Sequence, residues 1–428
     1  MSALKAFFEH RLSTDPLKAR IDWLDIVEGR HLLWSFISSP KRELIRSILN
    51  TLNLEIVKRA RPTSVFNFAE ASIGNMFLTG ARIFSGSFES AIYLLSMICS
   101  IPASVSVLPA INSNFTHHIS AGLADGSSIA GQVNISHPSA PTALPDDAMV
   151  APALTAADHD RIEDANLPGS LPALRRQHIA FSKDDEEDLP ARIERLWYIN
   201  PYGHEIWPVP NPKVIDALAS SEAVIYSIGS LYTSIMPSLV LRGVGQAISS
   251  SSSSSSSCCS SSSDSEPSSD IKKKILILNS KLDRETGPKR DPMTATDFVK
   301  AIARACGWGS SAAAGAGAAA AATAGGTATS SSTTTGGTAP PMAAANLRRY
   351  VTHLLYMDPS KVVVSRGGMT TTAASVMDGV PAVDVAELTG LGIECVRVDG
   401  RVDGEGRRAK LKYDEAALGR ALEGILDS

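Results

Sequence analysis

The stretch that decides the fold is residues 223–235, with the sequence AVIYSIGSLYTSI. Its first part is short, apolar and β-branched, which predicts a strand, and a helix-like segment that begins at Asn211-Pro212 precedes it. The strand ends in a loop with one glycine, Gly229, and several hydroxyl residues. An apolar segment at residues 239–248 comes next and predicts a helix. We therefore expect a strand, a polar loop and a helix start in succession.

This succession leaves unpaired backbone N–H groups at a helix N-terminus, where an anion is stabilised. The hydroxyl groups of the loop add further donors. The functional interpretation is a phosphate or nucleotide site, and the alternative is an ordinary βα turn without a ligand. The candidate phosphate-binding residues in this stretch are Ser227, Gly229, Ser230, Leu231, Tyr232, Thr233 and Ser234.

Composition limits the classes of function. The chain has 428 residues, is 44% hydrophobic and has a formal net charge of -4, so it is long enough for one large or two smaller domains. The mild acidity gives no reason to expect nucleic acid or an anionic membrane as a partner. The five cysteines lack regular spacing, which favours a reducing compartment. Because the N-terminus also lacks a signal peptide's apolar core, we expect a cytoplasmic protein.

Strands and helices alternate along the chain, which predicts an α/β fold with a mostly parallel sheet and helices on both faces. The hydrophobic patterns place strands and helices as follows. Strands are expected at 105–108, 193–200, 223–226, 271–278, 361–365 and 393–398, with a hairpin at 119–133, and helices across 2–61 and at 76–84, 88–99, 239–248, 298–306, 346–356 and 414–426.

Two tracts of biased composition interrupt this pattern. Residues 249–270 are almost wholly serine with acidic residues, so we expect disorder. Residues 307–345 consist mostly of Ala, Gly, Thr and Ser and predict a flexible linker with a transiently helical Ala-rich part. The tracts divide the expected domain into three parts, residues 1–248, 271–306 and 346–428.

Polar residues follow several of the predicted strands. Because ligands of a parallel sheet bind beyond the carboxyl ends of its strands, the loops at Asn112, Ser227 and Asn279 are expected to share one edge. Asn279 is therefore a further candidate binding residue. His117 and His118 are adjacent, so in a strand they point to opposite faces. One of them, His117 in our assignment, can face the pocket, and a histidine metal pair is not expected.

Five motifs together resemble those of a known family. They are Ser72-Ile73-Gly74-Asn75, Leu108-Pro109-Ala110-Ile111-Asn112, Asp125-Gly126 before Gly131-Gln132, residues 211–217 (NPKVIDA) and residues 229–235 (GSLYTSI). On these residues the chain resembles the CofD-like family over about residues 1–306. That family includes the 2-phospho-L-lactate transferases of deazaflavin coenzyme synthesis and gluconeogenesis factors that bind a UDP-sugar. The inserts are similar to those of its fungal branch.

The resemblance implies a Rossmann-like fold. It implies that Ser230, Thr233 and Ser234 line a phosphate site and that Asn75 and Asn114 border the same cleft. In the transferases the alcohol of a deazaflavin attacks an activated phospholactate, a nucleotide leaves and a divalent metal assists, so Mg²⁺ is the expected cofactor. The expected partner is a nucleotide or a nucleotide-linked phosphorylated small molecule, and a homodimer is an assembly to test.

The chain departs from the family pattern before Ser72. The family opens with a strand and a Gly-rich phosphate loop, whereas Gly29 is the only glycine in residues 1–71. We therefore expect the chain to begin inside the family domain. Three functions stay open: a transferase of a phospho-acid group, a non-catalytic nucleotide or UDP-sugar-binding regulator, and a truncated inactive member.

Overall fold

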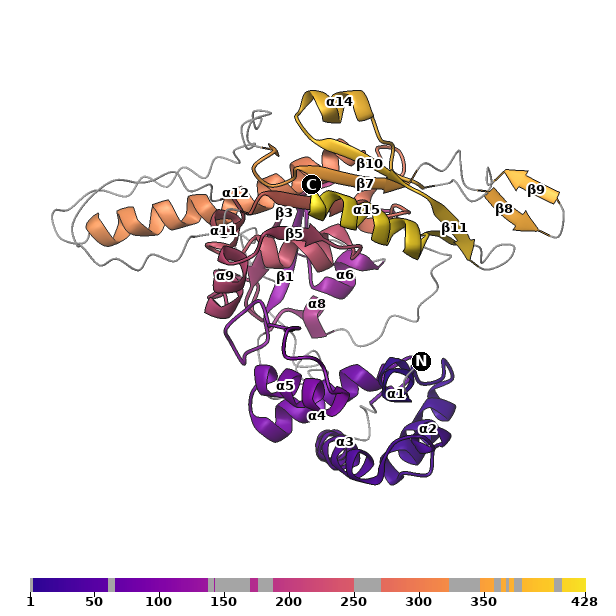
Figure 1. Cartoon of the computed structure of the whole chain (residues 1–428). Helices are drawn as coiled ribbons and strands as arrows, with labels where there is room; N and C mark the ends of the chain where they lie inside the picture. Colours follow the sequence, from indigo (N-terminus) through magenta and orange to yellow (C-terminus); the bar gives the residue numbers. More distant parts are fainter. Residues whose placement is uncertain are drawn as a thin grey trace, which may run out of the picture. The chain divides into compact units, whose positions relative to one another are not determined.

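The chain divides into two compact units (Figure 1). Among the described residues, those up to Phe115 form the first unit and those from Thr116 onward form the second. The computed structural model describes residues 3–60, 66–137, 142, 170–175, 188–249, 271–322, 347–357, 363–366, 369–372, 379–403 and 410–428.

The first unit is helical, which confirms the helices predicted across residues 2–61 and at 76–84 and 88–99. Its side chains Phe7, Trp23, Ile45 and Phe77 are fully buried in one core cluster. Roughly 1.5–3 kcal/mol of stabilisation per such side chain makes this core the unit's main source of stability. The elements are α1 (Ala3–Glu9), α2 (Pro16–Glu28), η1 (Leu32–Trp34), α3 (Ser39–Arg59), α4 (Ile73–Ser85) and α5 (Phe88–Cys99).

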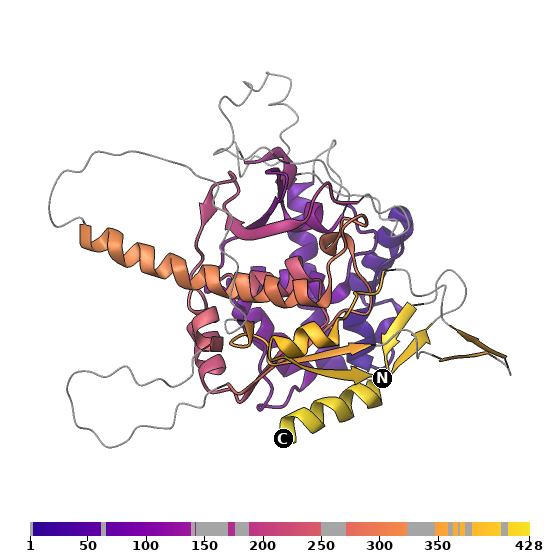
Figure 2. The same cartoon turned by 90° about the horizontal axis from the view of Figure 1, so that it is seen from above.

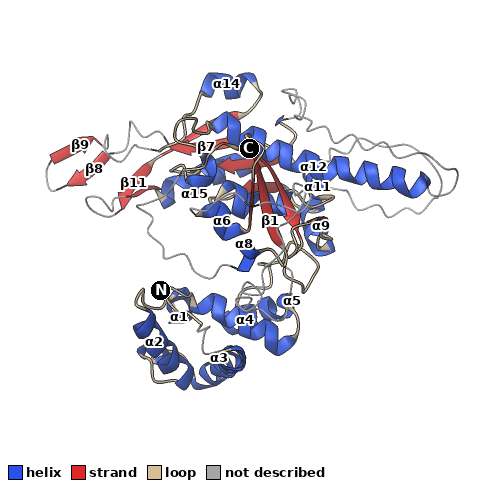
Figure 3. Cartoon of the chain, turned by 180° about the vertical axis from the view of Figure 1, so that it is seen from behind, coloured by secondary structure: helices blue, strands red, loops and turns tan. Residues whose placement is uncertain are grey.

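The second unit is built on a four-stranded parallel sheet, in the order β10-β7-β6-β5. The two central strands, β6 and β7, bury the apolar side chains Ile275, Leu276, Leu354 and Leu355, as expected for strands covered on both faces. Figure 3 shows these strands in red among blue helices. Their bounds are β5 (Ala223–Tyr226), β6 (Lys273–Ile277), β7 (His353–Met357) and β10 (Glu394–Val398).

Helices from different parts of the chain cover this sheet. Leu418, Leu422 and Ile425 of α15 (Glu415–Asp427) pack against Ile277 and neighbouring buried residues of the sheet. Figure 2 shows α15 and α12 (Ala295–Ala322) running on different sides of the parallel strands. The predicted α/β class with a parallel sheet is thus confirmed.

A second sheet of the same unit is antiparallel, in the order β2-β1-β3-β4. The hairpin of β1 (His118–Leu123) and β2 (Ser128–Ala130) turns at Asp125-Gly126, where Gly126 has a φ of 86°. β3 (Ile193–Ile199) and β4 (Glu205–Ile206) complete the sheet. The predicted hairpin and the strand at 193–200 are therefore present, but in a sheet separate from the parallel one.

The remaining described elements are short helices and two hairpins of short strands. They are α6 (Gln132–Ser136), α8 (Pro172–Arg175), α9 (Pro212–Ala219), the π-helical η2 (Leu231–Ile235), α10 (Met236–Leu239), α11 (Val244–Ser249), η3 (Arg284–Thr286), β8 (Val363–Arg366) paired with β9 (Met369–Thr372), α14 (Val385–Gly390) and β11 (Gly400–Asp403) paired with β12 (Lys410–Tyr413).

The strand predicted at residues 105–108 is wrong. No strand of the described residues pairs with this segment, and Val105 and Val107 are 55% and 58% exposed. Backbone N–H and C=O groups need hydrogen-bond partners to form a strand, and this part of the chain belongs to the helical unit. Asn112 therefore does not follow a strand of the parallel sheet.

Two predicted helices also differ from the structure. The helix predicted at 346–356 is wrong, because residues 353–357 form β7 between β6 and β10; a short apolar run does not distinguish a buried strand from a helix. The helix predicted at 239–248 is interrupted: α10 ends at Leu239 and α11 begins at Val244, after Gly243 with a φ of 85°. Helical turns also begin earlier than predicted, at Leu231. Pro237 lies in the first turn of α10, where the N–H that proline lacks is not needed.

Two other elements end at residues that differ from the prediction. Strand β2 ends at Ala130 instead of Val133, because Gly131 (φ 96°) turns the chain into α6. α12 continues to Ala322, well past the helix predicted at 298–306, since alanine has the highest helix propensity. The rest of the predicted linker, 323–345, and nearly all of the Ser-rich tract, 250–270, lie outside the described residues.

Among the described helices, none is long and apolar enough to span a membrane.

Candidate functional site

The loops after β5 and β6 leave the parallel sheet at the same edge. β5 and β6 are neighbours in register, with Tyr226 opposite Leu276. The Asn279 side chain after β6 donates a hydrogen bond from Nδ2 to the carbonyl oxygen of Gly229 after β5, at 3.2 Å. These two loops therefore meet at the carboxyl ends of their strands, as the sequence predicts. We call Ser227, Gly229, Ser230, Ser234 and Asn279 the rim.

The helix that follows β5, η2, begins at Leu231, and Ser230 precedes it. The N–H groups of Ser234 and Ile235 donate to the Ser230 carbonyl oxygen, at 3.0 and 3.2 Å. Ser230 is the N-cap, but its hydroxyl makes no capping hydrogen bond. In most helices the N-cap side chain accepts from the N–H groups two or three residues later. Here those N–H groups, of Tyr232 and Thr233, have another acceptor.

That acceptor is the carboxylate of Glu285 in η3. Its Oε2 accepts from the backbone N–H of Tyr232 at 3.1 Å and of Thr233 at 3.0 Å. Its Oε1 accepts from the hydroxyls of Thr233 at 2.5 Å and Ser136 at 3.0 Å. The anion held at this helix start is therefore one of the protein's own side chains.

Glu285 is only 2% exposed, and its surroundings oppose its charge. Burial raises the pKa of Glu285, and the nearby negative charge of Asp283 raises it further, whereas its hydrogen bonds to Thr233 and Ser136 act in the opposite direction. The guanidinium of Arg284, also buried, donates from Nη1 to the carbonyl oxygens of Asn134 and Ile135, at 2.9 and 2.7 Å. η3 thus joins α6 to the helix start after β5.

The candidate residues of this loop fall into two groups. Leu231, Tyr232 and Thr233 are buried, and the Tyr232 hydroxyl donates to the carbonyl oxygen of Ile193 at 2.9 Å. By contrast, Ser227 and Ser234 are exposed, and Gly229, Ser230 and Asn279 are half-buried. In this conformation the rim is therefore the part of the predicted site that a ligand can reach.

Close packing explains why position 229 is a glycine. A Cβ atom at this position would lie 2.7 Å from the Cβ of Ser234, closer than side chains approach one another. Glycine therefore lets the loop fold back against η2. A bulky substitution would disturb the loop whether or not a phosphate binds there, so Gly229 alone does not separate the two interpretations of this turn.

The other candidate residues belong to other elements of the fold. Asn75 lies in α4 and Asn114 near the end of the helical unit, where Arg82 donates to the Asn114 carbonyl oxygen. His117 precedes β1 in the antiparallel sheet, and its ring is edge-on to Tyr198 with a centroid distance of 6.4 Å. That Asn75, Asn114 and His117 border the same cleft as the rim stays a prediction.

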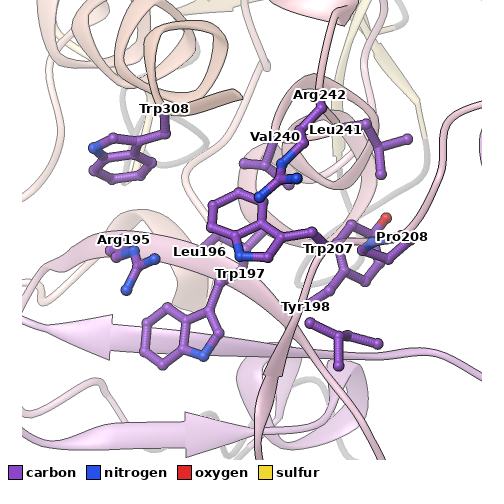
Figure 4. A pocket seen from close by; sticks show the side chains of 11 residues that line it. Arg195, Leu196, Trp197, Tyr198, Trp207, Pro208, Val240, Leu241, Arg242 and Trp308 are labelled. Carbon is purple, nitrogen blue, oxygen red and sulfur yellow. The ribbon is translucent and has the colours of Figure 1, made fainter. Parts of the chain in front are cut away.

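A pocket of the second unit has an aromatic and cationic lining (Figure 4). Arg195 lies over the Trp197 ring at 4.9 Å from its centroid, and Arg242 over Trp207 at 4.6 Å. Arg195 also pairs with Glu205 at 2.5 Å. Arg195 is thus engaged by both Trp197 and Glu205, whereas Arg242 stacks on Trp207 and its buried Nε has no hydrogen-bond partner among the described residues. We place the candidate site at the rim, where the loops of the parallel sheet meet.

Metal ligands are scarce around the rim. Within the described residues, no group of three or more His, Cys, Asp and Glu side chains converges as a metal site. The rim itself offers hydroxyl and amide groups, whereas Mg²⁺ bound by proteins usually takes one or two carboxylates besides phosphate oxygens. These residues do not fit the expected Mg²⁺, and no chemical step is assigned to it.

The sequence interpretation missed Glu285 and Ser136. Residues 283–287 have the composition of a polar loop and no site residue is predicted among them, although they follow β6 at the same edge as Asn279. A carboxylate placed shortly after a parallel strand is a signal that could have indicated Glu285. Nothing in the sequence around Ser136, at the end of a five-residue helix, indicates its contact with a residue 149 positions away.

The fold and the rim define an α/β protein with a polar candidate site at the carboxyl edge of a parallel sheet. The family model described as 2-phospho-L-lactate transferase CofD matches residues 3–322, and the chain belongs to this CofD family, as its motifs predict.

Relatives of this chain include an uncharacterized protein, YNL011C, of Saccharomyces cerevisiae. It is 38% identical over 301 residues, which are 66% of this chain and 63% of the yeast protein. The chain thus matches less than two thirds of that relative's length. Two solved structures of protein BH3568 from Bacillus halodurans, one described as a member of the UPF0052 family, are 17% identical, with TM-scores of 0.45 and 0.44. Each alignment covers 90% of this chain and 82% of that protein.

Proposed function

We propose that the rim binds the phosphate groups of a nucleotide-linked phospho-acid and that the chain is a 2-phospho-L-lactate transferase-like enzyme. The observation that carries this proposal is the meeting of the β5 and β6 loops through Asn279 and Gly229. In an open parallel sheet this edge is where ligands bind. Membership of the CofD family supports this class of substrate, and a Rossmann-like arrangement of the sheet belongs to the same proposal.

The rim has groups suited to phosphate oxygens. The hydroxyls of Ser227, Ser230 and Ser234 and the side-chain amide of Asn279 are hydrogen-bond donors. In the proposed reaction an acceptor alcohol forms a new O–P bond to the phospholactate phosphorus. The P–O bond to the nucleotide breaks, the nucleoside monophosphate leaves with the electron pair, and the proton of the acceptor hydroxyl is released to solvent. Donors fixed near the phosphorus stabilise the charge that develops on its oxygens.

A binding experiment tests the location of the site. We expect guanosine and uridine diphosphates to raise the melting temperature of the full chain according to ligand concentration over Kd, and Ser230→Ala to weaken that binding about fivefold to tenfold. Ser238→Ala is the matched control, because Ser238 is an exposed serine on the adjacent α10. Equal nucleotide binding by wild type and Ser230→Ala would count against the rim.

A second candidate function has support from Glu285. Its carboxylate holds the N–H groups of Tyr232 and Thr233, two donors that a transferred phosphoryl group would otherwise use. This arrangement suits a regulator that binds a nucleotide or UDP-sugar without chemistry. Turnover of a deazaflavin acceptor with an activated phospholactate, measured with and without Mg²⁺, separates the two: product formation supports the transferase, and saturable binding without product supports the regulator.

A further inference from the structure

The buried carboxylate of Glu285, at the start of η2, limits which anions the loop after β5 can bind. The N–H groups in the first turn of a helix have no partner within the helix and carry its positive end. In η2 the N–H groups of Tyr232 and Thr233 both donate to Glu285. Much of this positive end is therefore neutralised from within the protein before any ligand arrives.

The four hydrogen bonds of Glu285 come from two elements, the first turn of η2 and Ser136 at the end of α6. All four donors are protein groups, and the side chain is 2% exposed. This carboxylate is thus held in one place by its partners, and a second anion cannot share the same N–H groups.

We infer that Glu285 is a specificity-determining residue: its charge excludes phosphate from the Tyr232 and Thr233 amides and confines an anionic ligand to Ser227, Ser230 and Asn279. Two negative charges within about 6 Å repel each other appreciably near a protein surface. Only a ligand with further contacts at the rim, beyond its phosphate, then binds well. This inference rests on the proposed phosphate-binding role of the rim.

Charged groups around Glu285 are consistent with this role. Asp283 and Arg284 belong to the same turn, and the Arg284 guanidinium points to the carbonyl oxygens of α6. From η2 the titratable neighbour is Tyr232, whose hydroxyl donates to Ile193. α6 contributes Ser136. Among the described residues, no lysine or arginine forms an ion pair with Glu285, although Arg192, Arg304 and Asp297 act electrostatically on the neighbouring Tyr232.

Inorganic pyrophosphate is the probe, and Glu285→Gln is the variant. Glutamine keeps the length of the side chain, accepts the two N–H groups through its oxygen and donates its NH₂ to the hydroxyls of Thr233 and Ser136. With the charge removed, we expect pyrophosphate to bind the full chain roughly tenfold or more tightly at pH 7.5 by calorimetry. The control is Glu222→Gln, an exposed carboxylate that precedes β5 at the opposite end of the strand.

A second measurement serves if Glu285→Gln does not fold. The pyrophosphate affinity of wild type is compared with that of Ser136→Ala, which removes one hydrogen bond to Glu285 but leaves its charge, over a range of pH. We expect the pyrophosphate affinity of wild type and of Ser136→Ala to rise as the pH falls and the Glu285 carboxylate takes up a proton. This rise should exceed the difference in pyrophosphate affinity between the Glu222→Gln control and wild type. An affinity that does not rise toward acid pH overturns the inference.

The outcomes separate this inference from the proposed function. If Glu285→Gln gains pyrophosphate affinity while no nucleotide stabilises wild type, the inference stands and the proposed function fails. If nucleotides bind through Ser230 but Glu285→Gln and wild type bind pyrophosphate equally, the inference fails and the function stands. Folded Glu285→Gln that binds no pyrophosphate at all also overturns the inference.

Discussion

Two helix starts in the second unit solve the same problem in different ways. α9 begins after Asn211, whose Oδ1 accepts the N–H of Lys213 at 3.1 Å, with Pro212 in the first turn. η2 begins after Ser230, whose side chain makes no capping bond, and Glu285 accepts the N–H groups instead. The α9 cap lies next to its helix in the sequence. The acceptor at η2 arrives from more than 50 residues away, because β6 and η3 bring it to the same edge.

The difference shows where a ligand site can be inferred from a local pattern. At α9 the sequence signal and the hydrogen bond agree, because both depend on neighbouring residues. At η2 the local pattern indicates N–H groups without an acceptor, and a tertiary contact with Glu285 provides that acceptor. A polar loop before a helix thus predicts an anion-binding position, but it does not identify the anion.

The largest effect is expected from removing Glu285, the acceptor for the N–H groups at the start of η2. Glu285→Ala leaves the N–H groups of Tyr232 and Thr233 and the Thr233 hydroxyl without their acceptor in the interior, whereas the Ser136 hydroxyl keeps the Gln132 carbonyl oxygen. We therefore expect the free energy of unfolding to fall by about 3 kcal/mol or more. Urea unfolding of the full chain measures it. The exposed Glu222→Ala is the control and should change stability by less than about 0.5 kcal/mol. A small effect at Glu285 would show that the cap is dispensable.

The next effect concerns the loop between β5 and η2. Gly229→Ala places a Cβ 2.7 Å from the Cβ of Ser234, and we expect a loss of about 1–3 kcal/mol. The double variant Gly229→Ala/Ser234→Gly removes the contact and should recover more than the sum of the single changes predicts. Strictly additive free energies of unfolding would contradict this account of the glycine.

A smaller effect is expected at the local cap. Asn211→Ala removes the side-chain acceptor for the Lys213 N–H, and we expect a loss of about 1 kcal/mol. Asn211→Asp keeps an acceptor and should recover most of the stability. If Asn211→Ala costs as much as Glu285→Ala, the contrast between the two helix starts fails.

The last prediction is a direction of pH dependence. Because burial raises the pKa of Glu285 in the folded state, the unfolded protein gives up this proton more readily. The stability that protonated Glu285 contributes is therefore fully present below its unfolded pKa and is lost as the pH rises through its folded pKa. We expect Glu285→Gln to lack this loss, and Asn211→Ala to retain it, in unfolding measurements from acid to neutral pH.

The local parts of the fold were predictable because their signals lie within a few residues. The helices of the first unit, α9 and β5 follow from apolar spacing, proline positions and cap residues. The strand at 105–108 and the helix at 346–356 failed for the opposite reason. Whether a short apolar segment becomes a strand depends on partners such as β6 and β10, which lie far away in the sequence.

The sequence by itself determined the α/β class, the family and the loops that carry the rim, because apolar spacing, turn residues and motifs are local. Only the tertiary structure decided that Asn279 reaches Gly229 and that Glu285 takes the amides of Tyr232 and Thr233. The physical reason is that a buried donor must find an acceptor. Which of many polar side chains provides it is fixed by the packing of strands and turns distant in sequence.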